Sequence, residues 1–207
     1  TMTDTIAAIA TPFGSGGIGV IRISGPESFD LAGQIFSLSR QTFVPAQKLA
    51  DNRTARHGWI MDPDSGDIMD EVLLIPMKGP ASYTAEDVVE IQAHAGTLVL
   101  RKILDLVLAL GARLSEPGEF TRRAFLNGRI DLTQAEAVMD IINAKSANAL
   151  KFAAAQNTGT LKNDISQLRE TLVVLLARVE VDIDFPDEAQ AFKPTSQDLA
   201  LADQVLE

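Results

Sequence analysis

The sequence contains no cysteine, only two histidines and no long apolar run. Without cysteine there can be no disulfides, no thiolate metal sites and no thiol nucleophiles. Because His57 and His94 are the only imidazoles, a histidine-rich zinc or iron site is not expected. The longest apolar runs, such as residues 72–77, have about six residues, whereas a membrane span needs about 20. We therefore expect a protein that does not cross a membrane and that lies in the cytoplasm.

The composition is that of an ordinary globular protein. Of the 207 residues, 46% are hydrophobic and 22% are charged, which excludes collagen, low-complexity sequence and a wholly disordered chain. The 28 acidic and 18 basic residues give a net charge of -10. Since this charge repels a phosphate backbone, we expect the chain by itself to bind nucleic acid poorly.

Residues 1–118 predict an α+β domain. Val89 and Ile91 alternate with Glu90 and Gln92, as in a half-buried strand. The turn residues at 62–66 predict a hairpin between the strands that flank them. The predicted strands are 4–10, 18–24, 54–61, 68–76 and 87–94, the predicted helices are 26–36 and 98–110, and residues 38–53 form a loop.

Residues 119–207 predict helices only. A short helix follows Pro117-Gly118, a second runs from a capping box at Asp131 and Gln134 to about 156, and a third runs from about 160 to Phe185. Pro186 ends the third helix. An apolar stripe in that helix predicts packing against other helices, either within a bundle or in a partner chain. The stripe consists of Leu161, Ile165, Leu168, Leu172, Leu175 and Val179.

A glycine-rich segment, Gly14–Gly19, matches the G-x-G-x-x-G pattern of dinucleotide-binding proteins. Such a site needs a helix directly afterwards, whose N-terminus holds the pyrophosphate. The next residues, Val20–Ile23, are instead typical of a strand. We therefore interpret the segment as a glycine hairpin loop. The sequence also has no G-x-x-x-x-G-K-[ST] motif, and so no P-loop of its own.

Three segments carry polar residues that propensity does not explain: residues 20–25, 83–94 and 117–132. Taken alone, each has a structural interpretation. Arg22 could belong to an ion pair, Glu90 could lie on the polar face of a strand, and His94 could be a core histidine with its hydrogen bonds satisfied.

Together these segments resemble the N-terminal part of the MnmE/TrmE family of bacterial and organellar tRNA modification GTPases. The resemblance runs from about residue 4 to about residue 190. It is carried by Ala10-Thr11-Pro12, Gly16–Gly25, Tyr83–Glu90, Pro117–Gly128, Asp131–Ala137 and Asp184-Phe185-Pro186-Asp187-Glu188.

The resemblance implies a domain similar to the tetrahydrofolate-binding domain of aminomethyltransferases, at residues 1–118, followed by the first part of a helical domain. A GTPase domain that uses GTP, potassium and magnesium would be inserted after residue 207. The N-terminal domains would form a homodimer and bind 5-formyl-tetrahydrofolate. With a flavin-dependent partner protein, the whole enzyme would modify carbon 5 of the wobble uridine in tRNA, which it would contact mainly through parts outside this chain. The resemblance implies no catalytic residue and no metal ligand in this chain.

The family's folate-contacting positions correspond to Arg22, Glu90 and Arg129. A carboxylate can accept both donors of a pterin edge, and a guanidinium suits the anionic folate tail. The sequence departs from the family at three positions: Arg129 replaces a frequent Lys, and Ala85 and Ala95 replace a usual Gly.

Two alternatives remain open. The chain could be a dimerisation scaffold that binds no folate, which the apolar helix at 98–110 and the apolar stripe would suit. It could also be a free-standing enzyme similar to aminomethyltransferases.

Overall fold

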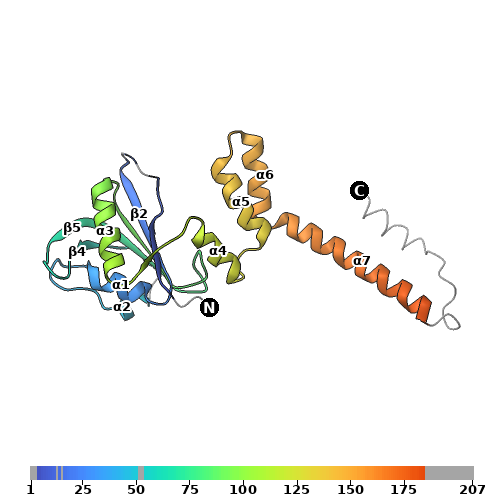
Figure 1. Cartoon of the computed structure of the whole chain (residues 1–207), viewed down its shortest axis with the longest axis horizontal. Coiled ribbons are helices and arrows are strands. Elements are labelled where there is room, and N and C mark those ends of the chain that lie inside the picture. The colour runs from blue at the N-terminus through green and yellow to red at the C-terminus, as the bar shows by residue number, and fades with distance from the viewer. Residues whose placement is uncertain (1–3, 13, 15, 51–53, 185–207) are drawn as a thin grey trace. The chain divides into compact units, whose positions relative to one another are not determined.

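The computed structural model describes residues 4–12, 14, 16–50 and 54–184. The chain divides into two compact units, Thr1–Ile130 and Asp131–Glu207 (Figure 1). The first is α+β and the second is helical in its described part, as the sequence predicts. We expected the helical segment to begin at residue 119. The structure instead includes the helix after Gly118 in the first unit, where an ion cluster joins Glu119 to Arg113 of the last strand and Arg123 to Asp4 before the first strand.

A seven-stranded mixed sheet forms the centre of the first unit, in the order β3-β4-β5-β6-β2-β1-β7. All neighbouring strands are antiparallel except β1 and β7. Every strand expected from the sequence is present. β3 and β7 were not predicted, because two residues are too few to show a period. The strands are β1 (Ile6–Ile9), β2 (Ile18–Ser24), β3 (Phe36–Ser37), β4 (Arg56–Met61), β5 (Ile68–Met77), β6 (Val88–His94) and β7 (Arg113–Leu114).

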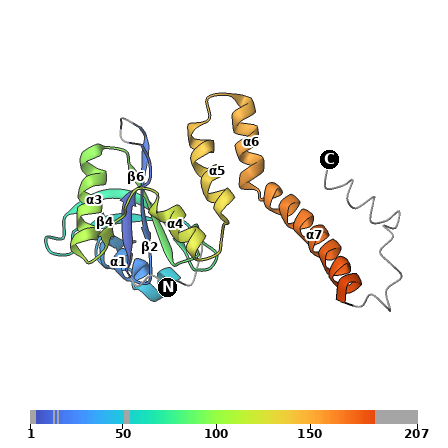
Figure 2. The same cartoon turned by 45° about the vertical axis from the view of Figure 1, so that its right-hand side comes forward.

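The helices of the first unit lie on both sides of this sheet (Figure 2). On one side, α1 (Ser28–Ile35), α2 (Ala46–Ala50) and α3 (Thr97–Ala109) pack against it and enclose the core. Every second residue of the central strands points into that core, including Ile21, Ile23 and Ile91. α4 (Glu119–Leu126) lies on the other side. The helix α2 falls in the predicted loop, since five residues are too short to show helical periodicity.

The second unit contains α5 (Leu132–Asn143), α6 (Ala147–Asn157) and α7 (Thr160–Asp184). The predicted capping box is present: Asp131 accepts a hydrogen bond from the Gln134 backbone at 2.8 Å, and Gln134 accepts one from the Asp131 backbone at 3.0 Å. The prediction of a single helix from 131 to about 156 was wrong. Ser146 adopts an extended conformation and caps a new helix, so the chain turns and α6 packs against α5.

The apolar stripe lies on α7, where Ile165, Leu168, Leu172 and Val179 are exposed. That other helices pack against this stripe, within a bundle or in a partner chain, remains a prediction. Two expectations lie outside the described residues: the end of the helix at Pro186 and the resemblance at Phe185–Glu188.

Candidate functional site

Arg22 and Glu90 lie directly opposite each other on β2 and β6. Since their strand neighbours Ile21 and Ile23 point into the core, Arg22 projects from the other face of the sheet. Its Nη2 and Nε lie 2.7 Å and 2.8 Å from Oε1 of Glu90. The two side chains are 24% and 19% exposed, so this ion pair is accessible to a ligand.

Aromatic rings surround the Arg22 guanidinium. Its carbon lies 5.0 Å from the centre of the Tyr83 ring and 5.5 Å from that of Phe120. Arg129, which follows α4, stacks on the same Tyr83 ring at 5.2 Å. The three residues expected from the resemblance are therefore close together, and Tyr83 is a common neighbour of the two arginines.

Sequence reasoning assigned no role to Tyr83 or Phe120, although both lie in the motifs that carry the resemblance. Their residue types could have marked both as candidates, because aromatic residues are scarce in this sequence: Tyr83 is the single tyrosine of the chain.

Two hydrogen bonds attach the segment before β6 to α4 and the turn after it. The Tyr83 hydroxyl lies 2.9 Å from Oγ1 of Thr121, and Asn127 donates to the Thr84 carbonyl at 2.8 Å. The aromatic rings and both arginines thus belong to one connected assembly within the first unit.

A buried ion cluster centred on Arg123 holds α4 in this position. The Arg123 side chain is fully buried, and its Nη2 donates to Oδ1 of Asp4 at 2.8 Å and to Oε1 of Glu119 at 3.2 Å. Its Nη1 lies 3.2 Å from Oε2 of Glu86. Arg113 of β7 also bonds Glu119, at 2.6 Å. Buried charges are tolerated when they are paired in this way.

The cluster changes the acidity of its members. Hydrogen bonds from Arg113, together with those from the Glu116 backbone and Arg123, lower the pKa of Glu119 to about 2, although burial opposes the shift. The hydrogen bond from Arg113 also lowers the pKa of Asp4, and the pKa of Arg113 is raised by its bonds to Glu119 and Asp4. All three groups are therefore charged at neutral pH.

One departure from the family pattern coincides with unusual backbone geometry. Ala85 has φ of 61°, in the left-handed region that favours glycine. Ala95, the other position at which the resemblance leads us to expect Gly, is buried, with 8% of its surface exposed.

The glycine motif and His94 have structural explanations. β1 and β2 pair antiparallel, and the described residues between them (10–12, 14, 16 and 17) include no helix, which confirms the hairpin interpretation of Gly14–Gly19. A Cβ on Gly19 would lie 2.5 Å from Leu100 of α3, so the helix packs closely there. His94 is not a core residue: its side chain is 70% exposed and lies 2.7 Å from Asp70.

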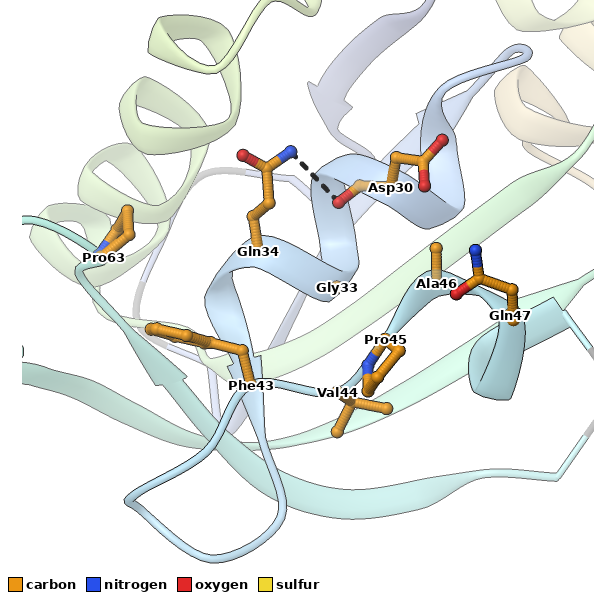
Figure 3. A pocket seen from close by; sticks show the side chains of 9 residues that line it. All are labelled: Asp30, Gly33, Gln34, Phe43, Val44, Pro45, Ala46, Gln47 and Pro63. Carbon is orange, nitrogen blue, oxygen red and sulfur yellow. Dashed lines mark hydrogen bonds between the residues drawn. The ribbon is translucent and has the colours of Figure 1, made fainter.

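A surface pocket of about 470 Å³ opens beside α1 and α2 (Figure 3). Phe43 and Pro45 line it together with Asp30 and Gln34, but Arg22, Glu90 and Arg129 do not. In the described ranges, no group of three or more His, Cys, Asp or Glu side chains could hold a metal ion. Among the helices that the structure describes, none has the length and apolar character that crossing a membrane requires.

Comparison with known families accounts for both units. The family model described as "GTP-binding protein TrmE N-terminus" matches residues 5–129, and "MnmE helical domain" matches residues 132–206. The chain belongs to the MnmE/TrmE family. The range matched by the first model includes Arg22, Glu90 and Arg129, and the range matched by the second begins at Leu132, the first residue of α5.

Relatives named tRNA modification GTPase MnmE are close in sequence. The relative from Acetivibrio thermocellus is 51% identical over 89% of this chain and 39% of its own length. Those from Carboxydothermus hydrogenoformans and Streptococcus sanguinis are 49% and 47% identical, over 90% and 94% of this chain and 40% and 41% of their own lengths. The chain thus spans about two fifths of these MnmE proteins, which is 39–41% of their length.

Proposed function

We propose that this chain is the folate-binding and dimerising portion of a GTPase that modifies tRNA. In the whole protein, a GTPase domain outside this chain would hydrolyse GTP with potassium and magnesium. Together with a flavin-dependent partner protein, the enzyme would modify carbon 5 of the wobble uridine in the cytoplasm. The names of the relatives support the tRNA and GTPase parts of this proposal.

The observation that carries the folate assignment is the Arg22–Glu90 ion pair beside Arg129 and Tyr83. Both Arg22 contacts go to Oε1 of Glu90. The other oxygen, Oε2, has no protein donor within the described part of the chain, so it can accept a hydrogen bond from a pterin N–H or amino group. Arg129 is exposed and can pair with the anionic tail of the folate. These residues bind and orient the ligand, which would supply the one-carbon unit.

Isothermal titration with 5-formyl-tetrahydrofolate tests this assignment. We expect the wild-type chain to bind and Glu90→Ala to bind at least about tenfold more weakly, because a charge-assisted hydrogen bond is lost. Glu71→Ala is the matched control: Glu71 is an exposed glutamate of β5 that pairs with His57. It should leave affinity unchanged.

Two results would contradict the folate assignment. One is the absence of binding both in this chain and in the full-length gene product. The other is a Glu90→Ala variant that binds as tightly as the wild type.

A dimerisation scaffold without folate binding is the second candidate. It is favoured by apolar side chains on the sheet face that carries Arg22: Ile18 is 66% exposed and Leu73 is 41% exposed. Sedimentation velocity of the wild type and of Leu73→Asp would test dimerisation through this face. A dimer that Leu73→Asp dissociates, together with no folate binding in the full-length protein, would favour the scaffold.

A further inference from the structure

Tyr83 is in contact with both arginines of the candidate site and with α4. Its half-buried ring lies 5.0 Å from the Arg22 guanidinium carbon and 5.2 Å from that of Arg129, and its hydroxyl bonds Thr121. One side chain therefore contacts the strand side of the site, the segment after α4 and α4 itself.

We propose that Tyr83 is the positioning residue of the folate site: its ring holds the Arg22 and Arg129 guanidinium groups in place for the ligand. This inference rests on the proposed function. Two like charges near one binding site repel each other, whereas the electron-rich face of an aromatic ring attracts both. The ring thus offsets the repulsion before the ligand arrives.

The dependence on Tyr83 differs between the two arginines. Arg22 is also held by Glu90 and by Phe120. For the Arg129 side chain, in the parts of the chain that the structure describes, stacking on Tyr83 is the one interaction among hydrogen bonds, ion pairs and ring contacts. Removal of the ring should therefore release Arg129 more completely than Arg22. A ligand would then have to order a long, free side chain, which lowers affinity.

The hydroxyl of Tyr83 fixes the orientation of the ring. Its 2.9 Å bond to Thr121 ties the ring to α4, which the Arg123 cluster attaches to the sheet. Tyr83→Phe removes this bond but keeps the aromatic face, while Tyr83→Leu removes both. The two variants separate the contribution of the ring from that of the hydroxyl.

Titration of the 207-residue chain with 5-formyl-tetrahydrofolate is the first arm of the test. We expect affinity within about threefold of wild type for Tyr83→Phe and at least about tenfold weaker for Tyr83→Leu. Trp59→Leu is the matched control. Trp59 is also a half-buried ring under a guanidinium, that of Arg40 at 4.4 Å, but it lies on β4. Trp59→Leu should bind 5-formyl-tetrahydrofolate with the affinity of the wild type.

The second arm uses the single tyrosine of the chain as a spectroscopic probe. With ¹³C-labelled tyrosine, the ring signals of Tyr83 should shift as folate saturates the site, which a residue that only supports the fold would not show. If Tyr83→Leu does not fold, the ring signals of Tyr83 in the wild type still test its role.

The outcomes distinguish this inference from the proposed function. Wild-type binding together with a Tyr83→Leu variant of equal affinity, or with unmoved ring signals, overturns the role of Tyr83 and leaves the folate assignment standing. A wild-type chain and full-length protein that do not bind overturn both.

Discussion

Glu119 and Arg123, one turn apart on α4, form an ion pair with 3.2 Å between Oε1 and Nη2, and neither side chain is exposed to solvent. The pair lies beside the candidate folate site rather than in it. Because the same helix carries Phe120 and Thr121, the buried charges determine where the aromatic contacts of Arg22 and Tyr83 lie. We therefore expect substitutions that destabilise α4 to weaken ligand binding at the candidate site as well.

The neighbouring arginines of α4 should differ sharply in their effect on stability. Arg123→Ala would leave the buried Glu119, together with Glu86 and Asp4, without their common partner. It should lower the free energy of unfolding by about 3–5 kcal/mol. Arg122 is the matched control, since its side chain is 50% exposed and pairs with Glu116 at 2.9 Å. Arg122→Ala should lower the free energy of unfolding by less than about 1 kcal/mol. Urea unfolding followed by the fluorescence of the single tryptophan, Trp59 of the first unit, measures both. Equal losses in the two variants would contradict the structural role of Arg123.

The lowered pKa of Glu119 predicts a specific acid sensitivity. In the folded state this pKa is about 2, against an ordinary value of 4.5. Glu119 therefore contributes stability above pH 4.5, and this contribution is lost as the pH falls from 4.5 toward 2. Its full size is on the order of 3 kcal/mol.

The comparison of wild type with Glu119→Gln across this pH range measures that contribution. The wild type should be the more stable at pH 7, and the difference should shrink below pH 4.5. Glu27→Gln, at an exposed position of the first unit, should follow the wild-type curve. A difference between wild type and Glu119→Gln that does not change with pH would count against the buried ion cluster as its source.

Most elements of the fold could be predicted because their signals are local. The alternation around Val89 and Ile91, the turn before Ile68 and the capping box at Asp131 each depend on neighbouring residues, and each is present. Short elements such as α2 have too few residues to show a period. The break at Ser146 was missed because alanine-rich sequence on both sides favours a continuous helix, while one capping serine decides the outcome.

The candidate site could be predicted only in part, because its contacts are distant in sequence. Periodicity does not show that Arg22 and Glu90 are opposite each other, nor that Arg129 reaches Tyr83; strand register and the position of α4 decide both. The resemblance to a family supplied these three residues. It did not supply the role of Arg123, which follows from burial, a property of the folded chain.

The left-handed conformation of Ala85 predicts a stabilising substitution. An L-residue in this region costs about 1–2 kcal/mol, whereas the extra freedom of glycine in the unfolded chain costs about 0.4–1 kcal/mol. Since φ is 61° at Ala85, Ala85→Gly should raise the free energy of unfolding by about 0.5–1 kcal/mol. Ala109→Gly, at an exposed position in α3, should lower it by a similar amount. Urea unfolding of the two variants would reveal the opposite signs, and a loss of stability in both would show that Ala85 is not strained.

Arg129→Lys should retain most of the folate affinity. The substitution keeps the positive charge that attracts the ligand's anionic tail but loses the flat guanidinium that stacks on Tyr83 at 5.2 Å. We expect affinity to fall by about threefold in Arg129→Lys and by about tenfold or more in Arg129→Ala. Added salt should weaken binding of the wild type and of Arg129→Lys alike, and it should affect Arg129→Ala less, because that variant has lost the charge. Arg101→Ala is the matched control, since Arg101 is exposed on α3, across the sheet from Arg22. Titrations with 5-formyl-tetrahydrofolate at low and high salt measure these affinities. Equal affinities of Arg129→Lys and Arg129→Ala would exclude a role for the charge of Arg129.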